Sequence, residues 1–120
     1  MREEVRWWLN TACGDLDSAV ALLDIGQFAT AAFHCQQAAG KFLKALVVAQ
    51  GGHLRTHSCL DLALNLQERG LEIDEAVISG CRTLDRQYIQ SRYPNGLGGD
   101  PTKYYDREFV EELVECVQTV

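Results

Sequence analysis

Apolar residues recur every three or four positions along most of this 120-residue chain, and glycines interrupt the pattern at intervals. This spacing places the apolar side chains on one face of an α-helix. A strand would require strict alternation of apolar and polar residues, which no segment of the sequence has. The pattern therefore predicts an all-α fold, and the length predicts a single domain over residues 1–120.

Glycines and prolines divide the chain into the expected helices. Gly26, Gly51 and Gly70 follow apolar stripes, and glycine ends helices because it can adopt the left-handed conformation past the last turn. Asp74 is a suitable N-cap for a fourth helix, and Pro94 ends that helix because the residue before a proline disfavours the helical conformation. The expected helices cover about residues 3–24, 27–50, 57–69, 74 to 92 or 93, and 106–117. We expect an up-and-down antiparallel bundle of four to five helices.

The charge of the chain limits the partners it can bind. Its formal net charge is -6, with 47% hydrophobic and 23% charged residues, proportions typical of a soluble globular protein. This charge excludes a global basic footprint for duplex nucleic acid, so any anion site must be a local basic patch. No apolar run is long enough to span a bilayer, and the first residues lack the layout of a signal peptide. We expect a cytoplasmic protein with no membrane partner.

Motifs for metal or covalent chemistry are missing from the sequence. The five cysteines are odd in number and include no C-x-x-C pair, which favours free thiols packed as small hydrophobes in a reducing compartment. Gly51 and Gly52 place His53 in a loop, so it is not expected to form a metal site with His57. There is no nucleophile–base pattern, phosphate-binding loop or dinucleotide-binding motif. We therefore predict no metal, no cofactor and no catalytic residue.

Basic residues gather on one face of the second expected helix. His34, Gln37, Lys41 and Lys44 follow one another at spacings of three, four and three, which places them on a single polar ridge. Lysines on such a ridge can bind a phosphate or an RNA backbone. The alternative interpretation is a solvated outer face with no ligand.

A second basic cluster lies at the end of the fourth expected helix. Arg86, Tyr88, Arg92 and Tyr93 come shortly before a loop that contains both prolines of the chain. Arginine offers a fork for phosphate and tyrosine offers a stacking surface for bases. The alternative is structural, because an arginine near a helix C-terminus interacts favourably with the helix dipole.

Three segments together resemble one known family. They are "DLDSAVALLDIGQFATAAFHCQQAAGKFLKALVVAQG", "THSCLDLALNL" and "YIQSRYPNG". Their order is similar to that of the HEPN domain family (higher eukaryote and prokaryote nucleotide-binding), over about residues 15–117. The resemblance implies a helical bundle that forms a homodimer and binds a nucleotide or RNA. It also implies a possible partner, a minimal nucleotidyltransferase, in a two-component module like a toxin–antitoxin pair.

The sequence departs from the family's metal-independent RNases. The resemblance implies that those members place a histidine four to six residues after an arginine. Here no histidine follows Arg86 or Arg92, since the last histidine of the chain is His57. Histidine is the usual proton donor or acceptor near neutral pH, so its absence there removes the expected catalytic group.

We therefore interpret the chain as a non-catalytic HEPN protein. Its predicted nucleotide- or RNA-binding residues are Lys41, Lys44, Arg86, Arg92 and Tyr93. One alternative is an RNase toxin with a degenerate site, in which an arginine stabilises the developing negative charge. Another alternative is a purely structural interaction module, because one of the adjacent residues Trp7 and Trp8 must point away from the helix face that buries the other.

Overall fold

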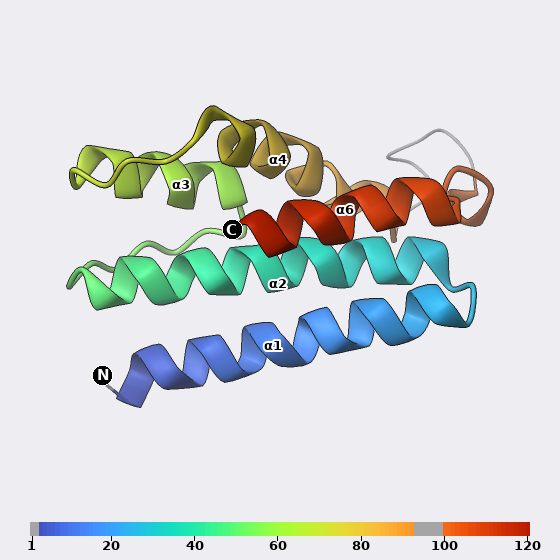
Figure 1. Cartoon of the computed structure of the whole chain (residues 1–120), viewed down its shortest axis with the longest axis horizontal. Coiled ribbons are helices and arrows are strands. Elements are labelled where there is room, and N and C mark those ends of the chain that lie inside the picture. The colour runs from blue at the N-terminus through green and yellow to red at the C-terminus, as the bar shows by residue number, and fades with distance from the viewer. Residues whose placement is uncertain (1–2, 93–99) are drawn as a thin grey trace.

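The computed structural model describes residues 3–92 and 100–120, and these parts of the chain contain helices and no strand. The elements are α1 (Glu3–Asp24), α2 (Phe28–Ala49), α3 (Cys59–Glu68), α4 (Glu75–Asp85), α5 (Gln87–Gln90), the 3-10 turn η2 (Pro101–Lys103) and α6 (Arg107–Thr119). The predicted all-α fold is confirmed (Figure 1). The predicted fourth helix is divided into α4 and α5 at Arg86, and Tyr93 lies outside the described residues. None of the described helices is long and apolar enough to cross a membrane.

Helices α1 and α2 form an antiparallel hairpin, as expected for an up-and-down bundle (Figure 1). Gly26 has a φ of +83°, and the amide of Gln27 donates to the carbonyl of Leu22 at 2.8 Å. This 6→1 bond satisfies a carbonyl that the end of α1 would otherwise leave unpaired. The chain therefore reverses within three residues.

The connection between α2 and α3, residues 50–58, is longer and runs back beside α2 (Figure 1). Contacts confirm this course, since Lys44 reaches the backbone of Leu54 while Gln36, two turns earlier on α2, reaches the backbone of His57. As a result α3 begins near the middle of the bundle and runs in the same direction as α2 (Figure 1). We call residues 50–58 the α2–α3 connection.

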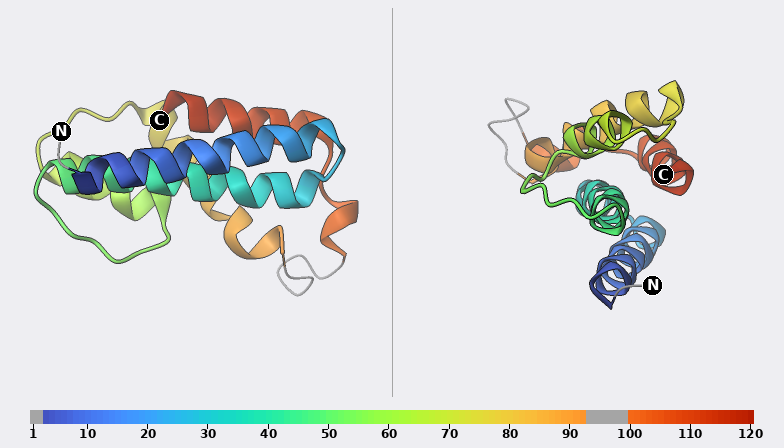
Figure 2. Two further views of the ribbon diagram at one scale, coloured as in Figure 1. Left: turned by 90° about the horizontal axis from the view of Figure 1, so that it is seen from below. Right: turned by 90° about the vertical axis from the view of Figure 1, so that its left-hand side faces the viewer.

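Helix α2 is the centre of the bundle, with α1 on one side and α3, α4 and α6 on the other (Figure 2). Its alanines at positions 31, 32, 38 and 39 are fully buried, and such small side chains allow neighbouring helices to approach closely. Larger side chains from the other helices complete the core; they are Leu62, Leu66, Ile78, Leu84, Val110, Leu113 and Val117.

The N-terminal part of α1 packs on α2 in a smaller cluster of its own. Val5 and Trp8 pack there against Val48 of α2. Trp7 remains 59% exposed, so the prediction that one of the two tryptophans points outward is confirmed. This packing sets Trp8 beside the C-terminal half of α2.

All five cysteines are unpaired, as the sequence predicts. Cys35, Cys59 and Cys81 are fully buried. Burial raises the pKa of both the Cys35 and the Cys81 thiols to about 12, so these groups stay protonated at neutral pH. They act as small hydrophobic side chains of the core.

Candidate functional site

A cleft of about 440 Å³ lies where α1, the middle of α2 and the α2–α3 connection meet. We call it the cationic cleft. It is lined by Trp8, Gln36, Gln37, Gly40, Lys41, Lys44, Arg55, Thr56 and His57. Three of these residues are cations and none is a carboxylate, although the chain as a whole carries a net charge of -6. The cleft is therefore a local basic patch in an acidic protein.

Helix α2 supplies one wall of the cleft. Gln37, Lys41 and Lys44 of the predicted ridge line this wall together with Gly40, whereas the fourth ridge residue, His34, does not line the cleft. Gly40 has no side chain, and a Cβ built at its position would meet only the sulfur of Cys59, at 3.8 Å. The wall of the cleft consequently has no side chain at this position, next to Lys41.

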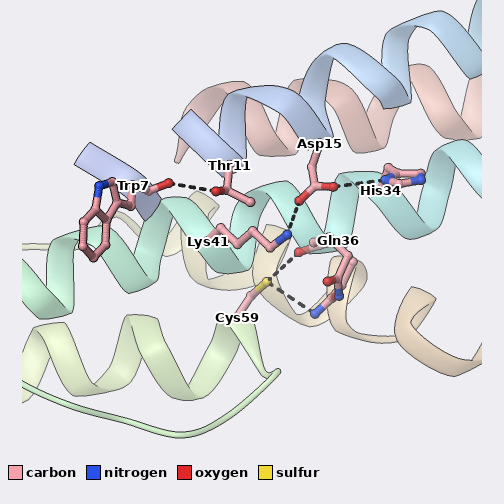
Figure 3. Close-up of polar contacts among 8 residues, drawn as sticks. Trp7, Thr11, Asp15, His34, Gln36, Lys41 and Cys59 are labelled. Carbon is pink, nitrogen blue, oxygen red and sulfur yellow. Dashed lines mark hydrogen bonds and ion pairs between the residues drawn. The ribbon is translucent and has the colours of Figure 1, made fainter. Parts of the chain in front are cut away.

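Lys41 is partly neutralised by a carboxylate from α1. Its Nζ lies 2.6 Å from Oδ2 of Asp15, while Nδ1 of His34 lies 3.2 Å from Oδ1 of the same aspartate (Figure 3). Asp15 is mostly buried in this arrangement, with 15% of its side chain exposed. The sequence analysis missed Asp15, which becomes a partner of the ridge only through the pairing of α1 with α2.

Lys44 links three elements at the base of the cleft. Its Nζ donates to the carbonyl oxygen of Leu54 in the α2–α3 connection and lies 5.6 Å from the ring centroid of Trp8. A lysine over an indole ring is held by a cation–π interaction, while its remaining N–H groups can still donate. Lys44 is therefore both a structural support and a candidate ligand group.

The α2–α3 connection presents Arg55 and His57 at the cleft. Arg55 is exposed and makes no hydrogen bond or ion pair with the residues that the structure describes. The ring of His57 stacks on Tyr88 with a centroid distance of 5.0 Å and an interplanar angle of 23°. Its backbone carbonyl accepts a hydrogen bond of 2.6 Å from the buried amide of Gln36. The imidazole is thus fixed in place, whereas the guanidinium of Arg55 is available for a ligand.

Asp85, the last residue of α4, holds the start of α3. Its carboxylate accepts from the amide of Cys59 at 2.7 Å, the amide of Leu60 at 3.0 Å and the hydroxyl of Ser58 at 2.9 Å. Ser58 is itself the N-cap of α3, and its hydroxyl accepts from the amide of Asp61. A carboxylate at a helix N-terminus also interacts favourably with the helix dipole. Asp85 therefore positions the connection that carries Arg55 and His57.

Arg92 stands on a small aromatic cluster next to the cleft. Its Cζ lies 4.3 Å from the ring centroid of Phe33 and 4.9 Å from that of Tyr88, and its Nε donates to the carbonyl of Tyr88 at 3.1 Å. Because His57 stacks on the same Tyr88, the cluster of Phe33, Tyr88 and His57 extends to the cationic cleft. We call these three rings the aromatic cluster.

Comparison with known proteins identifies the relatives of this chain. The family model of the HEPN domain matches residues 5–120. The chain belongs to the HEPN domain family. The resemblance that the sequence analysis describes is confirmed.

Three solved structures are similar to this HEPN chain over most of its length. TT1696 from Thermus thermophilus is 35% identical with a TM-score of 0.92, and the match covers 98% of this chain and 92% of that one. ST0689, an archaeal HEPN homologue, is 30% identical with a TM-score of 0.80 over 98% and 91% of the two chains. A HEPN domain protein from Thermotoga maritima is 30% identical with a TM-score of 0.75 over 92% and 88%. No curated protein matches the chain significantly.

The predicted binding residues of this HEPN protein lie in different places. Lys41 and Lys44 line the cationic cleft, and Arg92 lies on the adjoining aromatic cluster. Arg86 is exposed at the junction of α4 and α5 and does not line the cleft, while Tyr93 lies outside the described residues. Among residues 3–92 and 100–120 no three His, Cys, Asp or Glu side chains form a group that could hold a metal ion.

Sequence patterns missed Arg55 as a residue of this HEPN site. It comes from a segment without helical periodicity, so no spacing rule connects it to the lysines of α2. The signal that could have found it is its position between two histidines in "HLRTH", directly after the glycines that end α2.

Proposed function

We propose that this HEPN protein is a non-catalytic binding protein whose cationic cleft holds a phosphate of a nucleotide or RNA. The observation that carries the proposal is the lining of the cleft, with three cations and no carboxylate in an acidic chain. A charge-assisted hydrogen bond contributes about 1.5–3 kcal/mol, so two or three such contacts, about 3–9 kcal/mol together, correspond to dissociation constants from the millimolar to the micromolar range.

Binding to fluorescently labelled AMP and to a short labelled single-stranded RNA tests this proposal. We expect saturable binding that weakens as salt is added, because the main contacts are electrostatic. Arg55→Gln is the decisive variant, since Arg55 has no structural partner among the described residues. Loss of one charged hydrogen bond is expected to weaken binding by about tenfold or more.

Arg82→Gln provides a matched control. It removes the same charge from α4, where Arg82 is exposed and lies 3.6 Å from Glu75, outside the cleft lining. The control is expected to bind like the parent protein. The proposal fails if neither probe binds at millimolar concentration to folded protein, or if both variants lose affinity equally.

We further propose, on the basis of family membership, that the protein acts as a homodimer or together with a minimal nucleotidyltransferase. Sedimentation velocity at micromolar concentration tests the first part, and a monomer would contradict it. Mixing the protein with a nucleotidyltransferase encoded by a neighbouring gene tests the second part, and co-elution as one complex is expected.

A second candidate function, metal-independent RNA cleavage, has one contact in its favour. His57 and Arg92 come from distant parts of the sequence yet both contact the ring of Tyr88. This places an imidazole and a guanidinium against the same tyrosine ring, although the sequence lacks the arginine-to-histidine spacing of the family's RNases. Incubation of purified protein with tRNA and mRNA tests this function. RNA cleavage by the parent protein must be detected, and it must disappear in both His57→Ala and Arg92→Ala.

A further inference from the structure

We propose that the cationic cleft is a site for one phosphomonoester attached to a planar base, which is a nucleoside monophosphate or the phosphorylated end of a single-stranded RNA. This inference rests on the proposed function and specifies the ligand of the same cleft. It follows from the charge balance of the lining residues, from the support of the His57 ring and from the size of the cleft.

The charge balance favours a single phosphate group. Asp15 lies 2.6 Å from Lys41 and compensates its charge. Lys44 and Arg55 have no carboxylate partner in the described part of the chain, so two positive charges remain uncompensated. A phosphomonoester carries a charge of about -1.5 to -2 near pH 7, which these two cations match.

A triphosphate would bring additional negative charge that this cleft does not balance. The lining contains no fourth Lys or Arg, and the chain around it carries a net charge of -6. Repulsion between the extra phosphates and this negative field opposes their binding. The cleft is therefore expected to bind ATP no more tightly than AMP.

His57 supplies a supported stacking surface for the base. One face of its ring is covered by Tyr88 at 5.0 Å, and its backbone is held by the buried Gln36. The residue is nevertheless exposed and lines the cleft, two positions after Arg55. Stacking of a base on this ring costs little side-chain entropy of the protein, because the ring is already fixed.

The size of the cleft separates a nucleotide from a longer strand. Pockets for small ligands measure about 300–1,000 Å³, and the cationic cleft with about 440 Å³ lies at the lower end of that range. One nucleotide fits this space, and further nucleotides of a strand would lie outside it. In this proposal an RNA places its terminal phosphate between Lys44 and Arg55, because only the terminal phosphate is a monoester.

Titration calorimetry with four small probes tests the inference. They are inorganic phosphate, adenosine, AMP and ATP, all at one ionic strength. We expect AMP to bind at least tenfold more tightly than either adenosine or inorganic phosphate, and ATP to bind no more tightly than AMP. ATP binding tenfold more tightly than AMP overturns the inference while the proposed function stands. If no phosphate-bearing probe binds, both fail.

A pair of RNAs identifies the source of the phosphate. A tetranucleotide with a 5′-phosphate is compared with the same tetranucleotide ending in a 5′-hydroxyl. A tenfold preference for the phosphorylated end supports an RNA terminus as the ligand. Equal and weak binding of both RNAs, together with tight AMP binding, supports a free nucleotide. Equal and tight binding of both RNAs overturns the inference, since the cleft would then be reading the internal backbone.

Two substitutions of His57 test the stacking contact separately from charge. His57→Phe keeps a ring on Tyr88, and His57→Ala removes it. We expect His57→Ala to reduce AMP affinity to that of inorganic phosphate without changing phosphate affinity, and His57→Phe to retain most of the AMP affinity. If His57→Ala weakens AMP and inorganic phosphate by the same factor, the ring does not stack on a base. Circular dichroism of both variants confirms that they are folded.

Discussion

The α1–α2 link and the α2–α3 connection begin alike and then differ. Gly26 and Gly51 both have a φ of +83°, and each is followed by a residue whose amide closes a 6→1 bond, to the carbonyl of Leu22 or of Val47. The α1–α2 link then enters the next helix at once. The α2–α3 connection instead continues as irregular backbone through residue 58 and lines the cleft.

What holds the two segments accounts for their different roles. The short link is closed by backbone hydrogen bonds alone, whereas the longer connection is fastened by the side chains of Gln36, Lys44 and Asp85. Irregular backbone must satisfy its polar groups somewhere, and here side chains of α2 and α4 do so. The comparison teaches that the cleft depends on a few polar side chains, which substitutions can remove one at a time.

The largest effect is expected from Asp85→Asn. The amide cannot accept at both of its terminal atoms, so one of the N–H groups of Cys59 and Leu60 loses its acceptor and the other keeps only a neutral one. We expect the free energy of unfolding to fall by about 2–3 kcal/mol, measured by urea denaturation, because hydrogen bonds to charged groups are lost at a helix N-terminus. Native-state labelling of the Cys59 thiol should also become faster, since the connection loosens.

Asp74→Asn is the control for this prediction. Asp74 occupies the N-cap position of α4, as predicted, but its side chain makes no capping hydrogen bond. Its replacement is expected to change stability by less than about 0.5 kcal/mol. Equal losses for the two variants would contradict the role given to Asp85.

Gln36→Leu is expected to have the next largest effect. The buried amide of Gln36 donates to the carbonyl of His57 and accepts from Gln37, and leucine can do neither. The unpaired groups should lower stability by about 1–2 kcal/mol in urea denaturation. Gln67→Leu, which alters an exposed amide on α3, serves as the control and should change little. AMP binding weaker by a few fold in Gln36→Leu alone would tie the position of His57 to the cleft.

Substitution of the two equivalent glycines compares the segments directly. Gly26→Ala and Gly51→Ala each place a Cβ on a residue with φ of +83°, although neither Cβ meets another atom within 4 Å. Each is expected to lower stability by about 1 kcal/mol in thermal denaturation, because the left-handed conformation is strained for alanine. Equal losses would show that the segments share the same helix end. A much larger loss at Gly51 would mean that the start of the connection is under additional constraint.

Much of the bundle was predictable from the sequence, because its helices follow from local rules. The periodicity of the apolar residues and the glycines at positions 26, 51 and 70 gave the helices to within a few residues. The division between α4 and α5 at Arg86 was not predicted. The return of the α2–α3 connection beside α2 was not predictable, since it depends on contacts between distant residues. Gln36 and Asp85 are such residues, and nothing in their local sequence marks them.

The residues of the candidate site likewise fall into those that the sequence could predict and those that it could not. Lys41 and Lys44 were predictable because both lie on one helix at a spacing of three residues. Arg55 and Asp15 were missed because one lies in irregular backbone and the other belongs to a different helix. Their relation to the lysines depends on the register of α1 against α2 and on the course of the connection, and neither register nor course is encoded by a local pattern.

The smallest effect on stability, and a gain in binding, is expected from Asp15→Asn. This change removes the carboxylate 2.6 Å from Lys41, and a partly exposed ion pair of this kind contributes about 0.5–1 kcal/mol. The freed lysine adds a third uncompensated cation to the cleft, so phosphate-bearing ligands should bind more tightly, and ATP should gain more than AMP. Calorimetric titration of both nucleotides checks this, with Asp17→Asn on the exposed face of α1 as the control. Unchanged or weaker ATP binding would mean that Asp15 holds the cleft in shape and does not set its charge. The role of α1 at the cleft would then be structural and not electrostatic.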